Sequence, residues 1–162
     1  MDNLQQVPLT LNFSVPVTVH GTTTSISTTN AINYSIKGKA FTKGNLSNTA
    51  LTSANDINSG AAAVALAASQ GSVYVLMLDA SGNLRFAQGS VVALDGTTTG
   101  NFNGPSPQFP MIPDNFCPFA YVIVQNGSAG SAWTFGSSNY NASGITWTAV
   151  DICTLPFRPQ IS

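Results

Sequence analysis

The feature that most constrains this chain is a strict alternation of apolar and polar residues over positions 9–20. Successive side chains of a strand point to opposite faces, so the alternation predicts one long β-strand with a dry face and a wet face. Pro16 cannot donate a ladder hydrogen bond, which places this strand at a sheet edge or at a bulge. The polar set, which ends at His20, is expected to face water. The apolar set, expected to face the core, is Leu9, Leu11, Phe13, Val15, Val17 and Val19.

The rest of the composition favours β-structure. Charged residues make up 7% of the 162 residues, against about 25% in a typical domain, and Glu is absent. Polarity comes instead from Thr, which suits strands, and from Ser, Asn and Gly, which suit turns. The length is enough for one domain with its own core over residues 1–162. The sequence therefore predicts an all-β fold, a single-domain antiparallel β-sandwich with the jelly roll as the favoured topology.

Further elements follow from local patterns. A continuous apolar run over 72–78 predicts a strand covered on both faces, and the Asp79–Asn83 stretch, with Gly82, predicts a hairpin turn after it. Residues 21–30 are expected to form a turn region, and 61–68 fit either a short strand or a helical turn. The other expected strands cover 32–36, 84–87, 91–94, 119–125, 132–135 and 145–150.

The charge distribution limits the partners. Five bases and six acids give a net charge of −1, and the bases are too scattered to neutralise a phosphate backbone, so nucleic acid is not expected as a partner. The longest apolar run falls far short of the ~18 residues of a membrane-spanning helix. The first six residues lack the basic start and apolar run of a signal peptide. We expect a protein made in a cytosol, either kept there or carried elsewhere within a larger particle.

No constellation for catalysis is recognisable. His20 is the sole histidine and ends the polar set of the first strand, and no nucleophile-elbow motif occurs. The six Asp residues show no sign of a close carboxylate pair. Cys117 and Cys153 are expected to be free and mostly buried thiols, with a disulfide as the alternative. We therefore predict no enzyme, no cofactor, no metal and no small-molecule substrate.

Apolar residues in extended, proline-restricted stretches are the candidates for contacts. The Pro-rich segment, residues 105–118, cannot be helical, yet it holds apolar side chains that either pack back on the domain or lie on another subunit. The last eight residues combine apolar side chains with Pro156 and Pro159, which reduce the entropy lost on docking. Together with the start of the first strand, these stretches supply the predicted interaction residues Leu9, Leu11, Phe109, Met111, Ile112, Leu155, Phe157 and Ile161.

Three stretches carry a resemblance to a known class. At 105–118, in the glycine- and serine-rich stretch 126–135 and at 150–162, the chain resembles small virion proteins of tailed bacteriophages. Within that class it is most similar to head decoration (cement) proteins. The resemblance is one of overall style over most of the chain. It implies a homo-oligomer on the capsid exterior that is assembled in the host cytoplasm and locks neighbouring major capsid proteins together.

An alternative belongs to another class. Trp133, Phe135, Tyr140 and Trp147 could form an aromatic platform for a sugar in a tail-fibre or lectin module, although their alternation also suits core packing. Exposed tryptophans beside Asp or Asn would favour the carbohydrate-binding module, and buried ones the decoration protein. A capsid shell subunit is less favoured because the first six residues hold no Lys or Arg.

Overall fold

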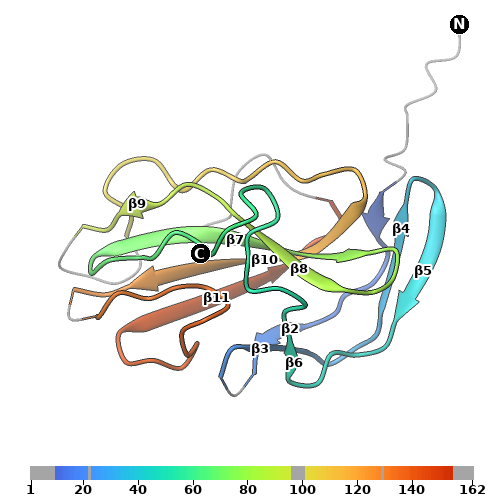
Figure 1. The fold of residues 1–162 in the computed structure, drawn as a ribbon, viewed down its shortest axis with the longest axis horizontal. Coiled ribbons are helices and arrows are strands. Elements are labelled where there is room, and N and C mark those ends of the chain that lie inside the picture. The colour runs from blue at the N-terminus through green and yellow to red at the C-terminus, as the bar shows by residue number, and fades with distance from the viewer. Residues whose placement is uncertain (1–9, 22, 96–100, 129, 155–162) are drawn as a thin grey trace, which may run out of the picture.

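The protein consists of antiparallel β-sheets, as the sequence predicts. The computed structural model describes residues 10–21, 23–95, 101–128 and 130–154. The largest sheet has the strand order β11-β10-β7-β8 with β9 beside β7 (Figure 1). Its strands are β7 (Gln70–Asp79), β8 (Leu84–Gln88), β9 (Val92–Ala93), β10 (Phe116–Asn126) and β11 (Ile145–Asp151).

Two smaller sheets come from the first third of the chain. One has the order β1-β4-β5 and the other the order β2-β3-β6, with antiparallel pairing throughout. Their strands are β1 (Leu11–Asn12), β2 (Thr18–His20), β3 (Ser25–Thr28), β4 (Ile32–Ile36), β5 (Lys39–Lys43) and β6 (Thr49–Ala50).

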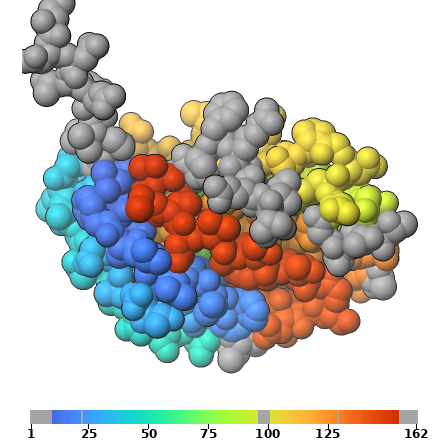
Figure 2. Space-filling model, turned by 180° about the vertical axis from the view of Figure 1, so that it is seen from behind, coloured from blue at the N-terminus to red at the C-terminus, as the bar shows by residue number. Residues whose placement is uncertain are grey.

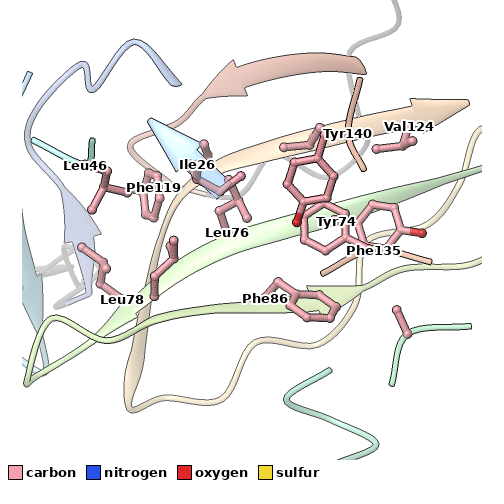
Figure 3. Close-up of a cluster of buried hydrophobic side chains, with 14 of the residues drawn as sticks. Ile26, Leu46, Tyr74, Leu76, Leu78, Phe86, Phe119, Val124, Phe135 and Tyr140 are labelled. Carbon is pink, nitrogen blue, oxygen red and sulfur yellow. The ribbon is translucent and has the colours of Figure 1, made fainter. Parts of the chain in front are cut away.

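The central strands β7 and β10 are buried on both faces, which confirms the prediction made for 72–78. On one face, Tyr74, Leu76 and Leu78 pack with side chains of the smaller sheets, such as Ile26 (Figure 3). On the other face, Val73, Val75 and Met77 pack with a second cluster, against which the partly buried Phe109 and Ile112 lie. The largest sheet is thus a middle layer, and alternate side chains of β7 enter opposite clusters.

The turn between β7 and β8 forms as expected. Asp79 Oδ1 accepts hydrogen bonds from the backbone N–H groups of Ser81 and Asn83, and Gly82 has a φ of 75°. Burial acts to raise the Asp79 pKa, but these bonds outweigh that effect and hold the pKa below its usual value. The short aspartate turn is therefore satisfied within its own loop.

Several local predictions were wrong. Residues 9–20 do not form one strand, since β1 and β2 are separated by an irregular stretch. Residues 25–28, expected in a turn, form β3. Residues 132–135 form no strand, because Trp133 only makes an isolated bridge with Leu66. The stretch 61–68 is neither strand nor helix and contributes isolated bridges at Ala62 and Leu66.

Candidate contact surfaces

The alternation over residues 11–20 exists in the structure, but its orientation is the reverse of the prediction. The polar residues Asn12 and Thr18 are buried, whereas four alternate apolar side chains face solvent. We call these four the apolar row: Phe13, 58% exposed, Val15, 66%, Val17, 44%, and Val19, 48%. They account for four of the six exposed large hydrophobic residues among those the structure describes.

Hydrogen bonding explains why Asn12 can be buried. Its Nδ2 donates to the carbonyl oxygens of Ser14, at 2.8 Å, and Ile152, at 2.9 Å. Its Oδ1 accepts from the backbone N–H of Ser14 at 3.1 Å and from the Ser14 hydroxyl at 2.8 Å. The Ser14 hydroxyl oxygen in turn accepts from the N–H of Asn33. With these bonds made, burial of the Asn12 amide carries little penalty, whereas the hydroxyl of the buried Thr18 has no hydrogen-bond partner among the described residues.

Val17 adopts an unusual backbone conformation beside an aspartate. Its φ is 55°, in the left-handed region that a β-branched residue rarely enters. In this conformation the N–H groups of Val17 and Thr18 both donate to the Asp151 carboxylate, at 2.7 and 3.1 Å. The carboxylate thus fastens the end of β11 to the start of β2, and residues near the two chain ends lie on one face of the molecule (Figure 2).

The Pro-rich segment packs mainly on its own protein, the first of the two alternatives considered for it. The ring of Phe109 lies edge-on to Tyr121 at 5.0 Å, and Ile112 packs against the same cluster. Gln108 exchanges hydrogen bonds with Ser90, donating to its Oγ at 2.8 Å and accepting from its N–H at 3.2 Å. These contacts fix the segment in place.

Met111 is the exception in that segment, since its side chain is 86% exposed. The Nδ2 of Asn58 donates to the Met111 carbonyl oxygen at 2.9 Å, which fixes the backbone that presents the thioether. Beside it lies a hollow of about 580 Å³ lined by Asn58, Gln88, Pro110, Met111, Ile112 and Pro113.

The aromatic residues form a buried cluster rather than a platform. Trp133, Phe135 and Tyr140 are at most 2% exposed, and Trp133 Nε1 donates to the Asn139 carbonyl oxygen at 2.9 Å. The half-buried Trp147 stacks on Phe135 at 5.8 Å between ring centroids and contacts Tyr140 at 4.8 Å. Desolvation raises the pKa of Tyr140. Ring faces packed in this way are not free to stack on a sugar.

Of the remaining predicted contact residues, only Leu11 lies within the described part of the chain. Leu11 is half-buried in β1, where it pairs with Ser35 of β4. Leu9, Leu155, Phe157 and Ile161 lie outside the residues that the structure describes.

The side chains that could act in catalysis or bind a metal ion do not form a common site. The edge of His20 packs on Trp147 at 5.7 Å, and its Nδ1 lies 3.0 Å from the Gly21 carbonyl oxygen. Cys117 is buried and Cys153 exposed, and both are free thiols. In the part of the chain that the structure describes, no three His, Cys, Asp or Glu side chains are grouped so as to hold a metal ion. No helix within the same residues is long and apolar enough to cross a membrane.

The sequence matches no protein-family profile and no curated protein, and the structure matches no solved structure. Two surfaces of the described residues expose apolar side chains and are the candidate contact surfaces: the apolar row and the hollow beside Met111.

Proposed function

We propose that the protein is a non-enzymatic virion subunit that decorates and stabilises the capsid of a tailed bacteriophage by docking on its major capsid proteins. The observation that carries the proposal is the exposure of Met111 above a mostly apolar hollow on a fixed segment. A flexible thioether presented on a rigid backbone is suited to contacts between proteins. For the fold we propose the β-sandwich with jelly-roll topology, supported by the face-to-face packing of antiparallel sheets across the core.

The low charge of the chain supports docking by apolar and backbone contacts. With 7% charged residues, little screening or counter-ion release accompanies binding. Raising salt from about 0.05 to 0.5 M should therefore leave capsid binding almost unchanged. A steep loss of binding with salt would contradict this mode of docking.

The test uses heads of the phage that encodes the chain, assembled without it. The purified protein should co-sediment with these heads in a saturable ratio, and Met111→Ser should weaken binding at least about tenfold. Val64→Ser is the matched control, because Val64 is 65% exposed and does not line the hollow. Absence of saturable binding would refute the proposal, and equal binding of both variants would exclude the Met111 surface.

The C-terminal residues Leu155, Phe157 and Ile161 remain predicted contacts of the same kind. Deleting 155–162 should leave the fold intact, as judged by circular dichroism, and weaken assembly on heads. Unchanged affinity of the truncated protein would mean that this segment contacts no partner.

A carbohydrate-binding module of a tail fibre or lectin is the alternative function. Its support was the aromatic set, whose rings pack against each other. Saturable binding of a glycan by the isolated protein would favour it over capsid decoration.

A further inference from the structure

The apolar row is an unusual feature for a protein surface. The row runs from Phe13 to Val19, across the irregular stretch between β1 and β2, and the left-handed Val17 interrupts its extended course. Single exposed apolar residues are ordinary, but a contiguous apolar patch marks an interaction site. The row exposes four such side chains at alternate positions, while Pro16 and Thr18 between them are buried and Ser14 is half-buried.

The borders of the row are polar, with the Asp151 carboxylate beside Val17. The N–H of Phe13 donates to the Asn33 carbonyl oxygen at 2.8 Å, and Asn30 Nδ2 donates to the Val15 carbonyl oxygen at 3.0 Å. Further along, Val19 pairs with Ser27. The nearby Asp151 carboxylate is occupied by the N–H groups of β2. The whole chain carries a net charge of only −1, so two copies repel each other little, and apolar contact rather than charge would hold them together.

We propose that the apolar row is a self-association surface, on which a second copy of the chain docks through its own row. With the two-fold axis perpendicular to the row, the two rows run antiparallel, so Phe13 of one copy lies opposite Val19 of the other and Val15 lies opposite Val17. The largest side chain then meets a small one at each end, which keeps the two surfaces evenly spaced.

The apolar area is consistent with a weak dimer. From the exposed fractions, the row offers roughly 300 Å² of apolar surface per copy. A standard interface buries about 800 Å² per partner, so the row would be the apolar centre of a small interface with a polar rim. An interface this small is expected to be weak, so the two copies should exchange readily.

The described course of the chain favours a second copy over the protein's own C-terminal residues. Asp151 lies beside Val17 and Thr18, whereas the carbonyl oxygen of Cys153 accepts from the N–H of Asn12. The chain therefore passes the row antiparallel to it and leaves at the Phe13 end. Covering the row with residues 155–162 of the same chain would require a reversal of direction, which a second copy does not need.

This inference deepens the proposed function, since it assigns the surface by which copies associate, but its test uses the isolated protein. Sedimentation of the full chain from about 1 to 500 µM should show a monomer–dimer equilibrium. The triple variant Phe13→Ser, Val15→Thr, Val19→Thr should weaken association at least about 30-fold. Val17 is left unchanged because its left-handed backbone conformation and its hydrogen bond to Asp151 hold the start of β2. The control, Val64→Thr, changes an exposed apolar residue elsewhere and should associate as the original protein does.

A monomer at all concentrations, or a triple variant that dimerises unchanged, would overturn the proposal. If the original protein is monomeric and deletion of 155–162 produces a dimer that the triple variant lacks, those residues cover the row instead. None of these outcomes depends on capsid binding, so either proposal can fail alone.

Cross-linking tests the register of the dimer. With Cys153 replaced by Ser, a Phe13→Cys chain mixed with a Val19→Cys chain should form a disulfide-linked pair on oxidation, because these positions face each other. Each variant alone should cross-link weakly. Preferential cross-linking of either variant to itself would refute the antiparallel alignment.

Discussion

The contact between Asp151 and the start of β2 provides the sharpest test of how the first strands are held. The carboxylate accepts from the N–H groups of Val17 and Thr18 at 2.7 and 3.1 Å. Asp151→Ala removes both acceptors and leaves two N–H groups to find water in a partly buried place. It also removes the interaction that accompanies the left-handed conformation of Val17.

The magnitude follows from the exposure of each bond. A hydrogen bond to a charged group contributes about 1.5–3 kcal/mol when it is protected from solvent. The bond to Val17 is exposed and the bond to Thr18 is partly buried, so we assign about 1 and 1.5 kcal/mol to them. Asp151→Ala should therefore lower the free energy of unfolding by about 2.5 kcal/mol. Asp151→Asn, which can still accept one of the two bonds, should cost about half as much.

Urea unfolding measures the effect as a lower midpoint with an unchanged slope. Asp114→Ala is the matched control, since it removes an exposed carboxylate elsewhere and should change the unfolding free energy by less than about 0.5 kcal/mol. If Asp151→Ala is as stable as this control, the carboxylate does not hold β2 and the account given of Val17 is incorrect.

Three further predictions concern other parts of the fold. Gly89→Ala should destabilise the protein by about 2 kcal/mol in the same urea assay, because the added Cβ would clash with the Gln108 carbonyl oxygen. A neutral effect would mean that the Pro-rich segment moves freely. One thiol per chain should react with a disulfide reagent near pH 8, because Cys153 is exposed whereas burial of Cys117 raises its pKa to about 12. Two reactive thiols in the native protein would contradict the burial of Cys117. The folded-state pKa of Asp79 is depressed, so the ionised carboxylate stabilises the fold fully above the unfolded pKa near 4. This stabilisation is lost as pH falls through the folded-state pKa. A measurement of the unfolding free energy against pH should show the loss, and Asp79→Asn should make the loss smaller.

Two predictions, the turn at Asp79 and the strand over 72–78 covered on both faces, agree with the structure. The turn at Asp79 needs only residues within four positions of it, so its sequence is sufficient to specify it. The uninterrupted apolar run 73–78 can be satisfied only where both faces are covered, and every one of its side chains is fully buried. Such elements leave the tertiary structure little to decide.

The apolar row was missed because a period of two defines two faces without saying which is buried. The decision depended on distant partners: Asn12 can lie inside because the carbonyl oxygen of Ile152, 140 residues away, accepts its amide hydrogen. The break between β1 and β2 likewise depends on Asp151, which meets Val17 only in the folded chain. The amino-acid sequence by itself determined that this protein is built of antiparallel strands and that alternate side chains point to opposite faces. Only the tertiary structure decided which set faces the core, because satisfying a buried polar group requires hydrogen-bond partners from the other end of the chain.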